Sequence, residues 1–244
     1  NSRKMGRGTV FERYEIKYII TEKQKELIKN GMEKYMAPDK YGRSVIRNIY
    51  YDTADSRLIR RSNEKPVYKE KLRVRSYKRV ESDDEKVFVE LKKKYNSVVY
   101  KRRTVLSENT AAKWLNDGQL PQEQTQIISE IEYFRRFYGS LVPSAFVSYD
   151  REAFFAVDGS DFRVTFDENI SARTTDLSLK KDVGGEKLLG NGLVLMELKT
   201  HSGIPLWMTS LLSENEIYKT SFSKYGTAYR TMIFPEKREI KNVC

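Results

Sequence analysis

The sequence has almost none of the residues that build disulfide frameworks or zinc sites. Its 244 residues include one cysteine, Cys244, and one histidine, His201. A single cysteine cannot form an internal disulfide, and no cluster of cysteine and histidine has the spacing of zinc ligands. We therefore expect a reducing environment, the cytoplasm.

Long apolar runs are also absent. No window approaches the ~18 consecutive apolar residues that a membrane helix needs, and residues 1–10 lack the apolar run of a signal peptide. The sequence therefore predicts a soluble chain, while a membrane-bound partner and the oligomeric state stay open. Residues 1–8 are expected to be a flexible leader. Residues 9–244 contain no linker or internal repeat and are expected to form one domain.

What the chain has in excess is positive charge. It carries 45 Lys and Arg against 34 Asp and Glu, a formal net charge of +11. Such a balance indicates an anionic partner, which could be nucleic acid, acidic lipid or a free phosphate compound. Nucleic acid is not expected, because the sequence shows no nucleic-acid-binding motif and most aromatic residues fall on the strand face opposite the basic ones.

Alternation of apolar and polar residues predicts a chain made mainly of β-strands. The predicted strands are residues 9–20, 45–51, 66–77, 86–93, 97–106, 144–157, 162–170 and 193–200. Helical spacing is found in residues 53–61, 108–116, 122–138 and 205–218, and a capping box of Thr21 and Gln24 begins one more helix. The segments that join the strands between residues 66 and 106 are too short for helical crossovers, so these strands should be antiparallel. The predicted fold class is α+β.

In the strand predicted at residues 66–77, four basic side chains share one face, because side chains alternate along a strand. They are Lys69, Lys71, Arg73 and Arg75, and they lie opposite Leu72 and Val74. The other strands place charged or polar side chains on one face in the same way: Arg13, Glu15 and Lys17; Glu90 and Lys92; Lys101 and Arg103; Tyr149 and Arg151; Arg163, Thr165 and Asp167; Glu197 and Lys199.

Two architectures explain this pattern. In the first, the sheet has one solvated face. In the second, about eight antiparallel strands form a barrel around a basic tunnel, with helices packed on the apolar outer faces. A tunnel with so many cations needs compensation by something that enters it, and a polyanion is the natural ligand.

Several of these segments together resemble a known family. They are FERYEIKY, KLRVR, VELKKK, KRR, SYDREAF, FRVTFD, MELK and FSKY, in this order. Over roughly residues 10–234 the chain is similar to the VTC domain, the polyphosphate polymerase module of the triphosphate tunnel metalloenzyme, or CYTH-like, superfamily. The superfamily's Glu-x-Glu-x-Lys motif opens here with Arg13, followed by Glu15 and Lys17. This departure favours the VTC branch over the tripolyphosphatase and cyclase branches.

The resemblance implies an enzyme that moves the γ-phosphate of ATP onto a growing inorganic polyphosphate chain, with Mn²⁺ or Mg²⁺, and releases ADP. The catalytic residues it implies are Lys17, Arg73, Arg75, Lys92, Arg151 and Lys224. The substrate-binding residues would be Arg13, Lys69, Lys71, Lys101, Arg103, Tyr149, Arg163, Lys199 and Ser223. Glu197 would bind the metal, with Glu15 and Glu90 as further candidates.

Other interpretations of the same residues stay open. Glu197 could instead form an ion pair inside the tunnel, and Glu15 and Glu90 could be spacers that keep the lysines apart. A hydrolase in which water accepts the phosphate, and a non-catalytic sensor of polyphosphate or nucleotide, are the two alternative functions. Arg13 in place of the first motif carboxylate argues against the hydrolase, and an intact Glu197 argues against the sensor.

Overall fold

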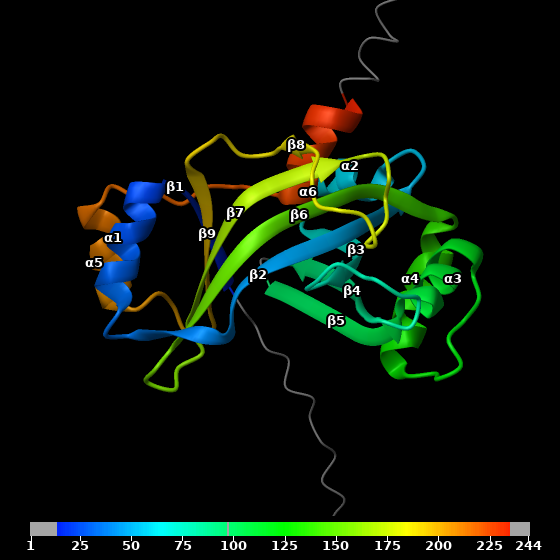
Figure 1. Cartoon of the computed structure of the whole chain (residues 1–244), viewed down its shortest axis with the longest axis horizontal. Helices are drawn as coiled ribbons and strands as arrows, with labels where there is room; N and C mark the ends of the chain where they lie inside the picture. The colour runs from blue at the N-terminus through cyan, green and yellow to red at the C-terminus, as the bar shows by residue number, and fades with distance from the viewer. Residues whose placement is uncertain (1–13, 97, 235–244) are drawn as a thin grey trace, which may run out of the picture.

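The computed structural model describes residues 14–96 and 98–234 (Figure 1). The expected leader and Arg13 lie outside the described residues. The strands are β1 (Tyr14–Thr21), β2 (Met36–Thr53), β3 (Tyr68–Ser76), β4 (Lys86–Tyr95), β5 (Val98–Ser107), β6 (Leu141–Ala156), β7 (Arg163–Arg173), β8 (Glu186–Lys187) and β9 (Leu193–Thr200). The helices are α1 (Glu22–Met32), α2 (Arg57–Asn63), α3 (Glu108–Asp117), α4 (Gln126–Tyr138), α5 (Leu206–Glu214) and α6 (Lys224–Ala228), which continues into the π-helix η1 (Tyr229–Ile233).

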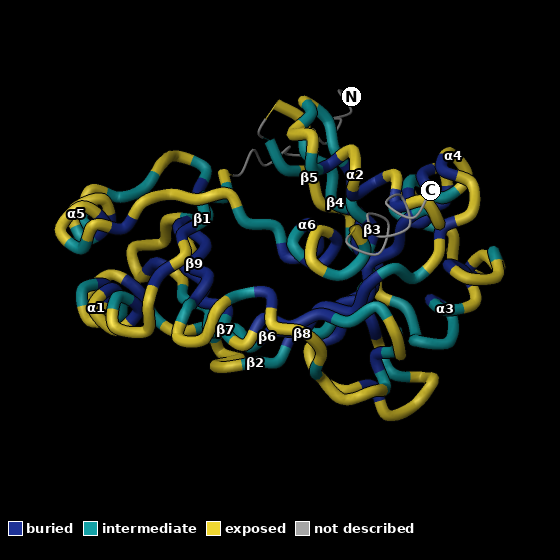
Figure 2. Tube along the Cα trace, turned by 90° about the horizontal axis from the view of Figure 1, so that it is seen from above, coloured by how far each residue is buried: buried dark blue, intermediate teal, exposed yellow. Residues whose placement is uncertain are grey.

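The strands form one antiparallel sheet in the order β1-β9-β7-β6-β2-β3-β4-β5, with β8 paired to β7. Figure 2 shows that the sheet curls into a trough, with β1 and β9 in one wall and β3, β4 and β5 in the other. This is the expected α+β fold with a barrel-like sheet. The barrel is not closed by a ladder of hydrogen bonds, because in the described residues β1 and β5 do not pair.

The free edge of β1 contacts a different segment. The backbone N–H of Thr220 donates to the carbonyl of Lys17 at 2.7 Å, in an isolated bridge. Thr220 belongs to the segment that leads from α5 to α6 and crosses the open side of the trough (Figure 2). The gap between the two edge strands is therefore spanned by this segment.

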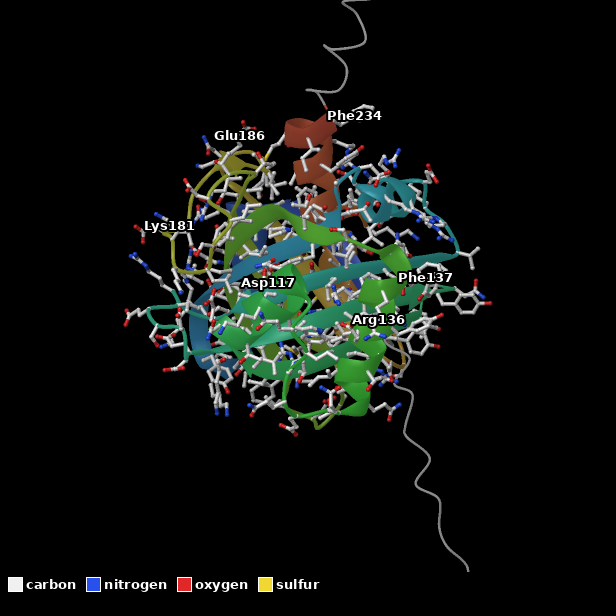
Figure 3. All side chains as sticks on the ribbon, turned by 90° about the vertical axis from the view of Figure 1, so that its right-hand side faces the viewer. Asp117, Arg136, Phe137, Lys181, Glu186 and Phe234 are labelled. Atoms are coloured by element: carbon white, nitrogen blue, oxygen red, sulfur yellow. The ribbon has the colours of Figure 1, made fainter. Side chains whose placement is uncertain are left out.

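The outer face of the sheet is apolar and covered by two helix pairs. Trp114 of α3 and Phe134 of α4 are buried against Leu72, Val89 and their neighbours on β3 and β4. Figure 3 shows α3, which carries the labelled Asp117, and α4, which carries Arg136 and Phe137, lying across these strands. On the other wall α1 and α5 bury a second cluster against β1, β7 and β9. These helices lie outside the sheet, as the alternation predicts.

Helix α6 corrects the expectation that every helix packs outside. It was not predicted, and it lies inside the trough in Figure 2. Its Tyr225 and Ala228 are buried against Tyr50 of β2 and Val147 of β6, and the rings of Tyr50 and Tyr225 stack at 4.6 Å. One part of the interior is therefore filled by an apolar cluster, and the charged residues occupy the rest.

Each predicted strand corresponds to a strand of the described ranges, with differences at the ends, while residues 9–13 of the first prediction and residue 97 of the fifth lie outside those ranges. The largest is in β2, which begins at Met36 and not at residue 45. Pro38 and Gly42 interrupt the alternating pattern, and the structure accommodates them as an irregularity in the pairing of β2 with β6 between Pro38 and Arg43. The helix predicted at residues 205–218 ends at Glu214. No helix in the described ranges is long and apolar enough to cross a membrane.

Asp52, at the end of β2, holds α2 and α6 in place. Its buried carboxylate accepts hydrogen bonds from the backbone N–H groups of Leu58 at 2.8 Å and Ile59 at 3.0 Å, and from the Tyr225 hydroxyl at 2.9 Å. It thus satisfies free N–H donors in the first turn of α2 and, through Tyr225, anchors α6 to the sheet.

We predict that Asp52→Ala lowers the free energy of unfolding by roughly 3 kcal/mol, because it leaves several buried donors unsatisfied. Glu64→Ala, an exposed change at the other end of α2, should stay within about 0.5 kcal/mol. Urea denaturation of both variants measures this, and losses of similar size would contradict the anchoring role.

Candidate active site

The concave face of the sheet gathers charged side chains from both walls of the trough. Contacts cross the interior between strands that are not neighbours in the sheet. Lys92 of β4 lies 2.6 Å from Glu15 of β1, and Arg75 of β3 donates to the hydroxyl of Tyr149 on β6 at 3.0 Å. These side chains therefore line one shared interior and not a solvated face.

Glu90 is the centre of one charge cluster. Its carboxylate is fully buried and accepts hydrogen bonds from Arg73 at 2.8 Å and from Arg103 at 2.7 Å, and Lys101 lies 2.7 Å away. Burial alone would raise the pKa of this carboxyl, but Arg73 and Arg75 outweigh it and hold the pKa far below its usual range. One carboxylate is thus shared among several cations.

Asp167 and Glu197 form a second cluster. Asp167 is fully buried and receives both arms of the Arg151 guanidinium at 2.6 Å. Lys224 lies 2.5 Å from Asp167 and 3.4 Å from Glu197. Burial would raise the pKa of Glu197, but Lys224 and Lys17 outweigh it and hold that pKa well below its usual range.

Two cations of the interior also donate to neutral groups. Lys71 donates to the hydroxyl of Ser223 at 2.8 Å, and Lys17 donates to the carbonyl of Phe222 at 2.7 Å. Burial, together with the nearby Lys17 and Lys92, lowers the pKa of Lys71 well below its usual value. The interior therefore has more positive charge than its carboxylates balance, and an entering anion would relieve this repulsion.

Tyr149 lies where the two clusters meet. Its hydroxyl accepts from Arg75, and the ammonium of Lys224 lies 4.4 Å from the centre of its ring. Burial would raise the pKa of this phenol, but the charges of Arg75, Arg151 and Lys224 lower it to about 8. The hydroxyl is thus polarised by cations and directed into the interior.

The structure brings together most of the residues predicted for the site. Those that meet in the interior are Glu15, Lys17, Lys71, Arg73, Arg75, Glu90, Lys92, Lys101, Arg103, Tyr149, Arg151, Glu197, Lys199, Ser223 and Lys224. Lys69 lies at the outer end of the row on β3. Arg163 is exposed at the start of β7, opposite Lys199. Arg13 falls outside the described ranges.

Three further residues belong to the site but were not predicted as functional. Asp167 balances Arg151 and Lys224, as described above. On β2, Asn48 accepts from Arg75 at 2.9 Å and Tyr50 accepts from Arg73 at 3.2 Å. In the sequence, alternation along β2 places Asn48 and Tyr50 on one face. The neighbouring residues of this strand are mostly apolar, however, which is typical of a strand in the hydrophobic core.

Glu197 has the chemistry expected of a ligand for Mg²⁺ or Mn²⁺. These cations prefer oxygen donors and are commonly held by one or two carboxylates together with substrate phosphates and water. Glu197 is 7% exposed, and its carboxylate lies within 3.6 Å of the ammonium groups of Lys17, Lys199 and Lys224. Among the described residues no group of three or more Asp, Glu, His or Cys side chains could hold a metal. A divalent cation there would therefore depend on oxygens of the substrate.

Comparisons with known proteins identify a family and a fold. A family model described as the VTC domain matches residues 12–233. A candidate adenylate cyclase from Bacillus halodurans has a similar structure, with a TM-score of 0.54 and 12% identity over 91% of this chain and 99% of that one. A candidate adenylyl cyclase from Hippeastrum, described as having a dominant triphosphatase activity, gives 0.53 and 16% identity over 90% of this chain and 95% of that one. No curated protein matches the chain.

We predict that Glu90→Gln destabilises the protein by roughly 3 kcal/mol, because it leaves buried cations uncompensated. Millimolar tripolyphosphate should restore much of the lost melting temperature by supplying negative charge inside the trough. The control is Glu130→Gln, which removes a surface partner of Arg102 at 2.8 Å and should cost at most about 1 kcal/mol. Thermal denaturation with and without tripolyphosphate is the measurement, and a Glu90 variant as stable as the control would refute the shared-carboxylate account.

Proposed function

This chain belongs to the VTC domain family, and on that premise we propose that it transfers the γ-phosphoryl group of ATP to the end of an inorganic polyphosphate chain and releases ADP. Family and fold support an enzyme that acts on triphosphate or polyphosphate. That the acceptor is a polyphosphate chain is proposed from one observation. It is the length of the row of cationic side chains that runs from Lys69 to Arg75 on β3, beside Lys92 and Lys94 of β4.

The row runs along the inner face of β3 from Lys69 to Arg75. At ~3.3 Å per residue it extends for ~20 Å, which is long enough to contact more phosphate groups than one triphosphate contains. Lys69 lies directly opposite Lys94 of β4, and Lys71 directly opposite Lys92. Like charges in opposed positions destabilise a sheet, so this arrangement favours a bound polyanion. A nucleotide and a second phosphate chain could be held end to end.

The chemistry requires positioning and charge neutralisation more than covalent help from the protein. Arg73 and Arg151 present planar guanidinium groups whose orientation is fixed by Glu90 and Asp167. Lys224 begins α6 and Ser223 caps it, so both lie between the apolar cluster around α6 and the charged part of the interior. These groups would hold the phosphate in line and stabilise its equatorial oxygens.

The transfer step itself balances without a general base. The terminal oxygen of the acceptor chain is already ionised, so it can form the new P–O bond as the bond to the β-phosphate bridging oxygen breaks and ADP leaves. A divalent cation held by Glu197 together with phosphate oxygens would add charge neutralisation at the transferred group. Enclosure by the trough would disfavour water as the acceptor.

The experiment that tests this function is incubation of the purified chain with ATP and Mn²⁺, followed by removal of the metal with a chelator and phosphorus NMR. Resonances of bridging phosphates with an equal amount of ADP are expected. Free phosphate as the sole product would indicate the hydrolase, and unchanged ATP would indicate the sensor.

We predict that Arg73→Ala lowers ATP turnover by roughly two orders of magnitude, the scale on which a lost transition-state donor acts. Arg102→Ala is the matched control, because Arg102 lies on the outer face of β5 and pairs with Glu130 of α4. It should leave turnover nearly unchanged. Steady-state turnover of the two variants is compared, and equal small losses at both positions would rule out catalysis in the trough.

A further inference from the structure

The arginines of the interior differ in the groups that hold them. Arg73 and Arg103 donate from Nε to the carboxylate of Glu90, at 2.8 and 2.7 Å. Arg151 donates two hydrogen bonds to the carboxylate of Asp167, both at 2.6 Å. Each of these three guanidinium groups is therefore fixed by a carboxylate, which also offsets part of its positive charge.

Arg75 is fixed in a different way. Its Nε donates to Oδ1 of Asn48 at 2.9 Å, and its Nη2 donates to the hydroxyl of Tyr149 at 3.0 Å. The pKa of Tyr149 is about 8, so at pH 7 both partners are predominantly neutral. Glu90 lies 3.9 Å from Nε, beyond hydrogen-bond distance. Within the described residues, Arg75 thus donates hydrogen bonds to neutral oxygens alone.

Asn48 is itself held on both sides. It lies directly opposite Arg75 in the pairing of β2 with β3, and it is fully buried. Its Nδ2 donates to the backbone carbonyl of Val147 on β6 at 3.1 Å, and this bond turns Oδ1 toward Arg75. A backbone group of a central strand therefore sets the amide, and the amide sets the guanidinium before any ligand enters.

We propose that Asn48 is the positioning residue for Arg75, and that its neutrality is essential to this role. The amide fixes the guanidinium and leaves its positive charge available to an entering phosphate, so the ordering cost of binding is already met. A carboxylate at this position would fix the same group and offset its charge. The statement about phosphate rests on the proposed function, and the positioning of Arg75 is independent of it.

Asn48→Asp separates fixation from charge, because the two side chains have the same shape and both offer an oxygen to Arg75. Calorimetric titration with tripolyphosphate at pH 7, with a chelator present, is the measurement. We expect the variant to bind tripolyphosphate roughly tenfold or more weakly, the scale of one hydrogen bond to a charged group.

Asn191→Asp is the matched control. Asn191 is an exposed residue between β8 and β9, and its Oδ1 accepts from Lys187 at 2.6 Å. The substitution makes the same change in net charge beside another cation. At physiological salt it should leave the affinity for tripolyphosphate within about twofold of the wild-type value, because exposed charges are screened.

A double-mutant cycle tests whether Asn48 acts through Arg75. Asn48→Leu removes both hydrogen bonds of the amide and keeps a branched side chain, and Arg75→Met removes the guanidinium. We expect Asn48→Leu to weaken tripolyphosphate binding roughly fivefold or more in the wild-type chain, and to have no further effect in the Arg75→Met chain. The cycle decides the matter even if Asn48→Asp does not fold.

Wild-type affinity in Asn48→Asp, or an equal loss from Asn48→Leu with and without Arg75, would overturn the proposal. Because the titrations need no turnover, they also separate it from the proposed function. If the wild-type chain makes no polyphosphate but Asn48→Asp weakens binding and the control does not, only the proposed function falls. If polyphosphate is made and Asn48→Asp binds like Asn191→Asp, only the positioning role falls.

Discussion

Mutual repulsion among the cations of the trough is the constraint on which the rest of the structure depends. Many lysines and arginines face one interior, and Glu15, Glu90, Asp167 and Glu197 are the carboxylates that balance them there. Each of these carboxylates has a pKa below its usual range, because the neighbouring cations outweigh the effect of burial. Part of the charge stays unbalanced, so an anion that enters the trough would stabilise the fold.

The direction of each side chain was predictable because it follows from local geometry. Along β3 the alternation alone assigns Arg73 and Arg75 to one face and Leu72 and Val74 to the other, and the structure confirms this. Short connections make β3, β4 and β5 antiparallel neighbours, which brings their charged faces together. The α+β class and most residues of the candidate site could therefore be predicted from the sequence.

The remainder depends on contacts between residues far apart in the chain. Helix α6 is too short for a clear periodic signal, and its place inside the trough depends on Tyr225 reaching Asp52 and Tyr50. The role of Asn48 likewise appears only when β2 lies beside Arg75. Asp167 could be assigned to the inner face, but its pairing with Lys224 required the position of α6.

The incomplete closure of the sheet has a topological consequence for a polymeric ligand. A barrel sealed by a ladder of hydrogen bonds would oblige a long chain to thread through it from one end. Here the walls are joined across the gap by few contacts, chiefly Lys17 with Phe222, Lys71 with Ser223 and Lys92 with Glu15. Each such contact contributes on the order of 1 kcal/mol, so separating the two walls at these contacts costs far less free energy than breaking a strand pair. Under the proposed function, a long phosphate chain would need only these contacts and the segment from α5 to α6 to move aside in order to enter sideways, without a free end.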